Sequence, residues 1–251
     1  MPKRPVIVHY HLFKNAGTSV DRILQRNFPD NQWAEIEGEN NKKMQPEEIV
    51  DFIRNNPQLK AVSSHTAVVN IPELEDIEIL PIFFMRHPID RIRSAYDFER
   101  KQDANTPGAI NAKTMDFQGY MQWRLSSANP WQVSDFHAMR LKDFHSFTPA
   151  KQRDLFLPRA KAALYALPVT GLVEQFQSSM ERYSEYLKPY FPDFVVENVR
   201  VNVTTSKKAS LEDNLNAFKK RIGAETYTQL LDVNKDDFIL YESIKSEYET
   251  P

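Results

Sequence analysis

Apolar and polar positions alternate in blocks along this chain, with short apolar runs followed by longer stretches of helical spacing. The first run, Val6–Phe13, predicts a buried strand, and Val20, Ile23 and Leu24 then recur at the spacing of a helix. Later runs predict strands at residues 59–64, 79–85, 169–173 and 194–203 and a helix from about 175 to 190. This alternation predicts an α/β fold in which helices cover a central, mostly parallel sheet.

Residues 103–158 break this pattern, because aromatic residues alternate with polar ones and Pro, Gly and Asn interrupt the stretch. It predicts a helical, aromatic-rich insertion with long loops in a single domain of residues 1–251, since no linker isolates it. Its aromatic rings either pack a core or form an acceptor-binding wall that stacks on a sugar or another flat substrate. The rings concerned are Phe117, Tyr120, Trp123, Trp131, Phe136, Phe144 and Phe147. The C-terminal third is predicted to be helical.

Composition narrows the class of protein. A chain of 251 residues with 41% hydrophobic residues can bury a substantial core. Its net charge of -2 gives no global basic field, so nucleic-acid binding is not expected. The absence of cysteine excludes disulfides, thiolate metal ligands and thiol catalysis. Because no signal peptide or membrane-spanning apolar run is found, we expect a soluble, cytoplasmic protein without membrane insertion.

The most informative polar segment is KNAGTS, residues 14–19, which lies between the first predicted strand and its helix. A helix N-terminus presents unpaired N–H groups and favours an anion. Lys14 adds a positive charge, Gly17 permits close backbone approach, and Thr18 and Ser19 add hydroxyl donors, so phosphate or sulfate is the expected guest. The competing interpretation is a helix capped by Thr18 or Ser19. The segment is not a Walker A loop, because its lysine precedes the glycine.

A second polar segment follows the most apolar predicted strand in FFMRHPIDRIRSAYDF, residues 83–98. Arg86 offers a guanidinium fork to a phosphate at the carboxyl end of that strand, and Ser94 adds a hydroxyl two helical turns later. The alternative is a surface salt bridge between Arg86 and Asp90, with Ser94 as a small packing residue. Arg91 and Arg93 are interpreted as surface charges.

Together, HLFKNAGTSVDRIL and FFMRHPIDRIRSAYDF resemble the 5′-phosphosulfate loop and the 3′-phosphate element of the carbohydrate sulfotransferases related to heparan sulfate 2-O-sulfotransferase. GLVEQFQSSM and VNVTTSKK are also similar to segments of that family, and the resemblance spans about Val6 to Lys208. Phe13, Asn15 and His87 stand where the family usually has proline, threonine and aspartate.

The resemblance implies a P-loop-like three-layer fold and a sulfotransferase that uses 3′-phosphoadenosine 5′-phosphosulfate (PAPS) and releases adenosine 3′,5′-bisphosphate (PAP). The residues that it assigns to this cofactor are Lys14, Asn15, Ala16, Gly17, Thr18, Ser19, Arg86, Ser94, Thr205 and Ser206. Thr205 and Ser206 belong to a loop that would close over the nucleotide, although a solvated basic turn explains that loop nearly as well.

Two residues are expected to be catalytic. Lys14 would stabilise the negative charge that grows on the leaving phosphate, and no metal is required. His65 ends a predicted strand and has the imidazole that suits a general base; the resembling family has a histidine at the matching place. The competing role for His65 is structural. His9 and His11 alternate on the first predicted strand, and either one of them lines the site or, as the favoured interpretation, they are core or edge histidines. A zinc site built from them is not expected, because no further ligands accompany them at a suitable spacing.

We therefore expect PAPS-dependent sulfation of a hydroxyl acceptor, either a carbohydrate or a small-molecule alcohol. A nucleotide-type P-loop kinase is the first alternative, disfavoured because GK[ST] and an acidic magnesium-binding strand end are missing. The second alternative is a non-catalytic nucleotide- or glycan-binding protein on the same scaffold. The residue types leave the acceptor and the oligomeric state open.

Overall fold

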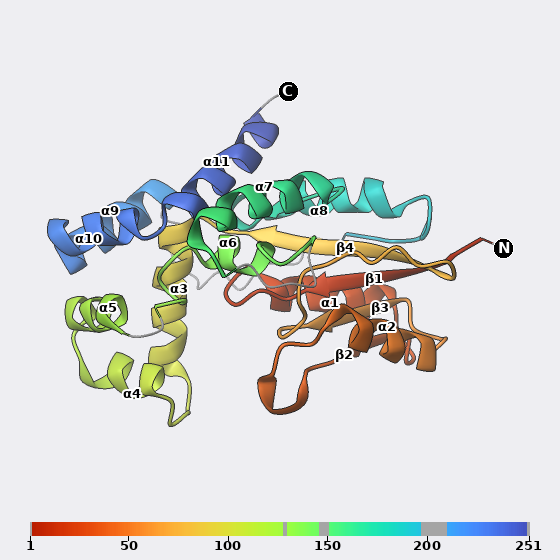
Figure 1. Cartoon of the computed structure of the whole chain (residues 1–251), viewed down its shortest axis with the longest axis horizontal. Coiled ribbons are helices and arrows are strands. Elements are labelled where there is room, and N and C mark those ends of the chain that lie inside the picture. The colour runs from red at the N-terminus through yellow and green to blue at the C-terminus, as the bar shows by residue number, and fades with distance from the viewer. Residues whose placement is uncertain (1, 128–129, 146–150, 197–209, 250–251) are drawn as a thin grey trace. The chain divides into compact units, whose positions relative to one another are not determined.

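The computed structural model describes residues 2–127, 130–145, 151–196 and 210–249. The chain forms two compact units. The first comprises Met1–Met85 and Arg140–Val203, and the second comprises Arg86–Met139 and Thr204–Pro251. Figure 1 labels the helices and strands along the chain. Each unit is described by itself below.

A parallel sheet forms the centre of the first unit. Its strands are β1 (Arg4–Tyr10), β2 (Trp33–Glu35), β3 (Ala61–Ser64), β4 (Ile77–Met85) and β5 (Gly171–Leu172). The described residues form a five-stranded sheet in the order β2-β3-β1-β4-β5, with β1 paired to both β3 and β4. Every pairing in this order is parallel, which confirms the predicted α/β class with a central parallel sheet.

Several strands differ from the predicted ones. β1 ends at Tyr10, because the chain turns before Phe13, and β5 has only two residues. The sequence did not predict β2, whose three residues are too few to show a period. In the strand predicted at 194–203, residues 194–196 are not extended into a strand, and residues 197–203 lie outside the described part of the chain.

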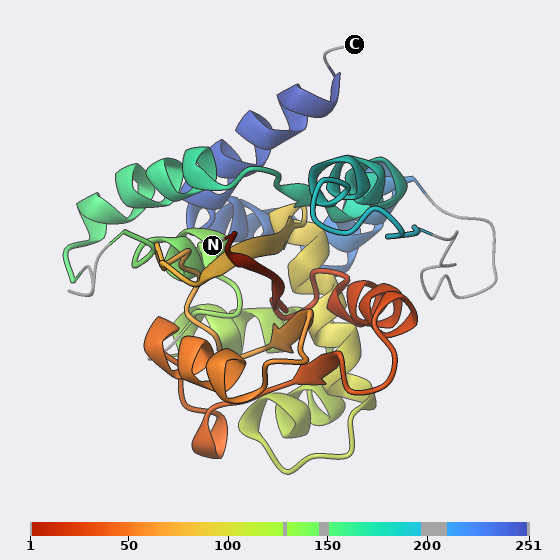
Figure 2. The same ribbon diagram turned by 90° about the vertical axis from the view of Figure 1, so that its right-hand side faces the viewer.

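Helices cover both faces of this sheet. They are α1 (Gly17–Asn27), α2 (Pro46–Asn55), α7 (Phe156–Ala166) and α8 (Phe176–Leu187), with short 3-10 turns η1 (Glu39–Asn41), η2 (Arg153–Leu155) and η3 (Val173–Gln175). Seen end-on in Figure 2, the strands run between two helical layers, with α1 and α8 on one face and α2 and α7 on the other. This three-layer arrangement is consistent with the P-loop-like fold expected of a sulfotransferase.

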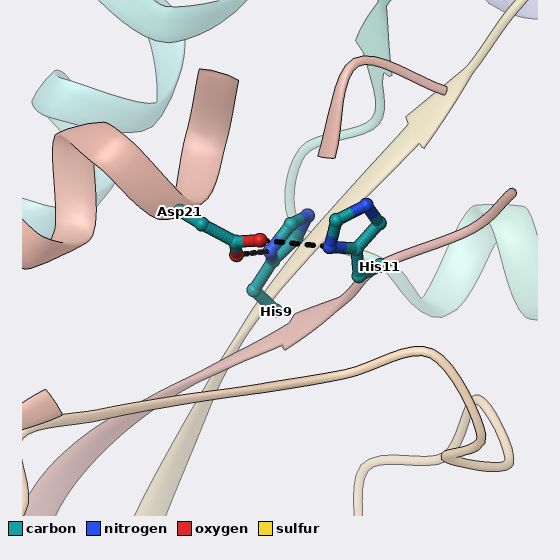
Figure 3. Close-up of side chains that lie close together, drawn as sticks. All are labelled: His9, His11 and Asp21. Atoms are coloured by element: carbon teal, nitrogen blue, oxygen red, sulfur yellow. Dashed lines mark hydrogen bonds and ion pairs between the residues drawn. The ribbon is translucent and has the colours of Figure 1, made fainter. Parts of the chain in front are cut away.

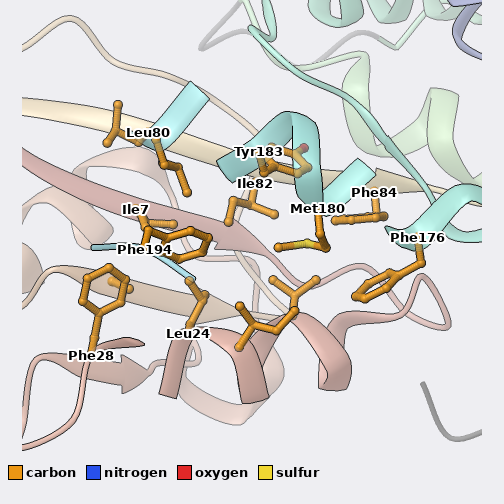
Figure 4. Packing of buried hydrophobic residues seen from close by; sticks show 14 residues of the cluster. Ile7, Leu24, Phe28, Leu80, Ile82, Phe84, Phe176, Met180, Tyr183 and Phe194 are labelled. Carbon is orange, nitrogen blue, oxygen red and sulfur yellow. The ribbon is translucent and has the colours of Figure 1, made fainter. Parts of the chain in front are cut away.

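The layer between the sheet and helices α1 and α8 is a continuous apolar core (Figure 4). Ile7 of β1 belongs to it together with Val20, Ile23 and Leu24 of α1. Each side chain of this size contributes about 1.5–3 kcal/mol when fully buried. Because successive strand residues point to opposite faces, the α1 side of β1 is defined by Ile7 and continues to His9.

The second unit is helical in its described residues. Its helices are α3 (Pro88–Lys101), α4 (Pro107–Thr114), α5 (Phe117–Ser126), α9 (Leu211–Ile222), α10 (Ala224–Asp232) and α11 (Lys235–Glu249), and α6 (Phe136–Leu141) begins in it. A core joins Tyr96, Phe117, Tyr120, Phe218 and Leu230. Most rings of the predicted insertion therefore pack, but Trp131 is 41% exposed, and Phe147 lies outside the described residues.

A buried ion pair supports this second core. Arg124 Nη2 lies 2.6 Å and 2.8 Å from the two carboxylate oxygens of Glu99, and Arg124 Nε donates to the Tyr120 hydroxyl at 2.9 Å. Gly108 packs against this pair so closely that a Cβ would lie 2.4 Å from Arg124 Nη2. Among the residues that the structure describes, no helix combines the length and apolar content needed to cross a bilayer.

Candidate functional site

The turn between β1 and α1 has an unusual backbone. Lys14 and Ala16 adopt positive φ angles of 65° and 61°, a left-handed conformation that is uncommon for residues other than glycine. Ala16 is the N-cap residue of α1, and no side chain of the described residues caps this helix. Thr18 and Ser19 instead lie inside the first turn of α1. Thr18 and Ser19 thus lie close to the N-cap, as the competing interpretation has it, but neither caps the helix, and the helix N-terminus keeps its preference for an anion.

Two contacts hold this turn against the sheet. Asn15 is buried, and its Nδ2 donates a 2.6 Å hydrogen bond to the backbone oxygen of Phe84 near the end of β4. Gly17 lies beside the imidazole of His11, and a Cβ at this position would lie 2.0 Å from His11 Cδ2. A side chain at residue 17 would displace that ring. Lys14 is half-buried, whereas Thr18 is exposed at the surface of α1.

A cluster of His9, His11 and Asp21 lies behind the turn (Figure 3). The alternation of β1 directs His9 to the face that α1 covers, and Asp21 projects from the second turn of α1 toward the same place. His9 Nδ1 is 2.7 Å from Asp21 Oδ1, and His11 Nδ1 is 2.8 Å from Asp21 Oδ2. Ser63, the β3 residue paired with His9, places its Oγ 3.0 Å from His9 Nδ1.

His65 follows β3 and lies against the same cluster. Its ring stacks on the ring of His11 with 3.7 Å between centroids and an interplanar angle of 28°. Glu37 Oε1 accepts from the His65 backbone N–H at 2.7 Å and lies 2.8 Å from His65 Nδ1. The imidazole is therefore held on one face by His11 and at one edge by Glu37, while 44% of the side chain stays exposed.

Burial and hydrogen bonding have opposite effects on the pKa values of these residues. Burial alone would raise the pKa of Asp21, but the close contacts of its two oxygens with the His11 and His9 imidazoles hold this pKa far below its ordinary value. Burial lowers the pKa of His9 in spite of the attraction of Asp21, which favours its neutral form. Burial would also raise the pKa of Glu37, yet hydrogen bonds from His65 and Thr66 lower it. Both carboxylates are therefore held ionised.

Arg86 and Ser94 belong to the second unit. Arg86 directly follows β4, and its Nε and Nη2 lie 2.8 Å and 2.5 Å from Asp90 Oδ2. The other oxygen of Asp90 accepts from Arg93 Nη2 at 2.8 Å. The salt bridge between Arg86 and Asp90 that the sequence offered as an alternative is therefore present, although it is largely buried and does not lie on the surface. Ser94 lies on α3 at a half-buried position, two turns after the helix begins.

The prediction of a surface charge is wrong for Arg91, which is buried, whereas the side chain of Arg93 is 27% exposed. Arg91 is 1% exposed, its Nη2 donates to the backbone oxygen of Gln132, and its guanidinium lies 4.2 Å from the centroid of the Phe136 ring. Arg93 is half-buried and binds Asp90 and Asp97. The helical spacing of α3 could not reveal Arg91's burial, because the chain that covers it lies about forty residues away in sequence.

Sequence reasoning missed two residues of the site. Asp21 supplies a third metal-ligating side chain beside His9 and His11, so the reason for rejecting a metal there was wrong. The signal was available, because two histidines alternate on a strand and an acidic residue lies in the second turn of the next helix. Glu37 gave no such signal, since it follows a strand too short to be predicted. Thr205 and Ser206 lie outside the described residues.

Comparison with known proteins identifies a family and a relative. A model described as the sulfotransferase family matches residues 1–242. An uncharacterized protein of Archaeoglobus fulgidus is 38% identical over 254 residues, and the match covers 98% of each chain. The family match includes the turn before α1, the cluster behind it and the segment of Arg86 and Ser94.

Proposed function

Because the chain belongs to the sulfotransferase family, we propose that it transfers a sulfuryl group from PAPS to a hydroxyl acceptor, releasing PAP. The observation that carries this proposal is the turn of residues 13–16. It combines a lysine and left-handed backbone with the N-terminus of α1, which no described side chain caps. The order of the strands adds support. β1 lies at the point where the strand order reverses, with β3 on one side and β4 on the other, and α/β sheets bind ligands at the carboxyl ends of the strands at such a point.

The residues of the turn fit the 5′-phosphosulfate end of PAPS. The backbone N–H groups at the start of α1 and the Lys14 ammonium supply positive charge, and Thr18 adds an exposed hydroxyl. Ser19 is buried and completes the first turn of the helix, and Asn15 holds the turn to β4. When bound, PAPS supplies the sulfuryl group and a phosphate leaving group. Lys14 then stabilises the charge that develops on the phosphate oxygen.

Arg86 and Ser94 are proposed to bind the 3′-phosphate, as the resemblance of their segment implies. Asp90 is shared by two arginines, so Arg93 can hold this carboxylate while the Arg86 fork binds a phosphate. Thr205 and Ser206 are proposed to close over the nucleotide. The acceptor is proposed to be a carbohydrate or a small-molecule alcohol.

His65 is proposed as the general base that takes the proton of the acceptor hydroxyl. A carboxylate can only accept hydrogen bonds. The contact between Glu37 and His65 Nδ1 therefore places the proton of the neutral imidazole on Nδ1. Nε2 consequently carries the lone pair that receives a proton. Glu37 is the positioning residue, because one of its oxygens binds both the ring and the backbone N–H of His65.

Calorimetry with PAP and with adenosine 5′-phosphate tests the nucleotide assignment. Arg86→Ala should weaken PAP binding by about 10–100-fold, the effect of one charged hydrogen bond, and leave adenosine 5′-phosphate nearly unchanged. Arg93→Ala is the matched control, because it also removes an arginine from Asp90 but should still prefer PAP. A wild-type preference for ATP with magnesium over PAP would contradict the proposal and favour the kinase alternative.

Turnover of PAPS over a panel of sugars and alcohols separates an enzyme from a binding protein. His65→Ala should lower turnover by about 10²–10⁴-fold with PAP affinity retained, which is the range for losing a general base. His145→Ala is the matched control, since His145 is exposed in the same unit and has no proposed role. Full turnover in His65→Ala would remove this residue as the base.

A further inference from the structure

We propose that His9, His11 and Asp21 form a binding site for a divalent transition-metal ion such as Zn²⁺. Each residue offers one ligand atom, and the three atoms lie within 4.8 Å of one another. All three side chains are buried, with exposed fractions of 1%, 8% and 8%. The inference is independent of the proposed sulfuryl transfer, because it concerns a cation behind the turn and no step of the reaction uses it.

The geometry of His11 favours a shared cation over a network of hydrogen bonds. His9 Nδ1 meets Asp21 Oδ1 as a hydrogen bond at 2.7 Å. His11 Nδ1 is just as close to Asp21 Oδ2, at 2.8 Å, but among the described residues this buried nitrogen has no hydrogen-bond partner. The two atoms are therefore in ion-pair contact without forming a hydrogen bond. Buried polar atoms are normally satisfied, and an ion bound to both atoms would satisfy this one.

The ligand set selects the class of ion. Imidazoles bind a metal ion in their neutral form, so two histidines and one aspartate supply a single negative charge to a divalent cation. Imidazole nitrogen suits Zn²⁺ and its first-row neighbours, whereas Mg²⁺ and Ca²⁺ prefer sets made of oxygen ligands. A set of two histidines and one carboxylate leaves at least one coordination position for water or another group.

A neighbouring group of Glu35, Glu37 and His65 also brings three potential ligand atoms together, but it is exposed. There the carboxylate of Glu37 already accepts from the backbone N–H and the ring of His65 at 2.7 Å and 2.8 Å. Exposed acidic groups are solvated by water and need no ion. This second group therefore provides the internal control for the first.

The position of the proposed ion gives it a structural role. His11 precedes the turn of residues 13–16, and Asp21 follows it in α1, so one ion would join both ends of the turn. Gly17 lies between these ends, and because it has no side chain, the His11 ring can occupy the space beside it. The ion would therefore fix the left-handed backbone of the turn. Binding to the folded chain alone would raise stability by mass action.

The test is titration of untagged, chelator-treated protein with Zn²⁺ by calorimetry and with Co²⁺ by visible absorption. We expect one ion per chain with a Kd of about 10 μM or lower. Asp21→Asn and His9→Gln keep similar shapes but remove a ligand, and each should weaken binding by at least about 10-fold. Glu37→Gln should bind as tightly as the wild type, and circular dichroism should show that each variant is folded.

Two results would overturn the proposal. One is the absence of binding by the folded wild-type protein at about 1 mM Zn²⁺ or Co²⁺. The other is binding that survives in both Asp21→Asn and His9→Gln but is lost in Glu37→Gln, which would place the ion in the exposed group. Neither result bears on PAP binding, so failure of this inference is distinguishable from failure of the proposed function.

Discussion

Each unit of the chain buries an aspartate against histidine, and the two clusters are built differently. In the second unit, Asp237 Oδ2 accepts from the backbone N–H and the Nδ1 of His137 at 3.0 Å and 2.8 Å. Its Oδ1 accepts from the Ala138 N–H at 2.8 Å. In the first unit, Asp21 is shared between the rings of His9 and His11, and only the contact with His9 is a hydrogen bond.

The difference teaches how to separate a structural pair from a candidate ligand set. Asp237 caps the start of α6, so backbone donors and one imidazole satisfy both of its oxygens. Both side chains of that pair are fully buried, at 0% exposure. In the cluster of Asp21, by contrast, the Nδ1 atom of His11 makes no hydrogen bond among the described residues. This cluster lies at the carboxyl end of the central strand β1, beside the turn. Residue type alone does not distinguish them; the direction of the donors does.

The largest expected effect is the loss of Asp237. Asp237→Ala leaves His137 and two backbone N–H groups without their acceptor, so the free energy of unfolding should fall by about 3–5 kcal/mol. Urea unfolding measures this change. Zn²⁺ affinity of the remaining folded protein should not change, because Asp237 is a capping residue here. A loss below about 1 kcal/mol would contradict the structural role.

A third buried histidine, His87 of the second unit, sharpens the comparison. Burial lowers the pKa of His87 from 6.5 to about 4. The unfolded chain therefore takes up a proton first, and the stability due to the neutral imidazole is complete above pH 6.5 and falls as pH drops toward 4. The difference of about 2.5 pKa units corresponds to a loss of about 3 kcal/mol.

Urea unfolding of the wild type and His87→Gln at pH 7, 5.5 and 4 checks this expectation. The variant should lose less stability than the wild type over this range, because glutamine does not titrate. His145→Gln, which changes an exposed histidine, should follow the wild type. Equal acid sensitivity in wild type and His87→Gln would show that His87 does not contribute.

Metal addition and removal should affect the two clusters differently. At a free Zn²⁺ concentration 100 times Kd, the wild type should gain about 2.7 kcal/mol in unfolding free energy, and a chelator should reverse the gain. Asp21→Asn should gain little. Asp237→Asn, the matched change in the other cluster, should gain as much as the wild type. Thermal unfolding with and without the chelator provides the measurement, and equal gains in all three proteins would contradict the comparison.

The smallest expected effect concerns Ser63, which approaches the same nitrogen of His9 as Asp21 does. Ser63→Ala removes a hydroxyl 3.0 Å from His9 Nδ1 and should lower stability by about 1 kcal/mol without changing Zn²⁺ affinity. Ser179, another fully buried serine of the first unit, is the control for an ordinary buried hydroxyl. A larger loss for Ser63→Ala than for Ser179→Ala would make Ser63 a principal partner of His9.

Much of the first unit was predictable from the sequence. The apolar runs around Ile7, Val62 and Ile82 became β1, β3 and β4, because buried parallel strands are recognisable by continuous apolar residues. The turn before α1 was also located, since its composition differs from that of the elements beside it. β2 and β5 were missed or overextended, because two or three residues show no period.

The chemistry of the site was less predictable. The resemblance of short motifs pointed to Lys14 and Arg86, and the position of His65 at the end of a predicted strand pointed to that residue. Asp21 and Glu37 were missed because their importance comes from contacts with residues of other elements. Arg91 was misjudged for the same reason, because a distant segment buries its guanidinium. The periodicity of a sequence indicates which residues share a face of one helix or strand, but it does not show which two elements pack together.

The sequence by itself determined which family this chain belongs to, the parallel α/β class and the position of the lysine-containing turn before α1, because those features are encoded in local periodicity and in contiguous motifs. Only the tertiary structure decided that Asp21 joins His9 and His11 and that Glu37 orients His65. The physical reason is that parallel strands and the helix covering them bring residues that are distant in sequence to one edge of the sheet. The orientation of each hydrogen-bond donor is fixed only when these elements pack together.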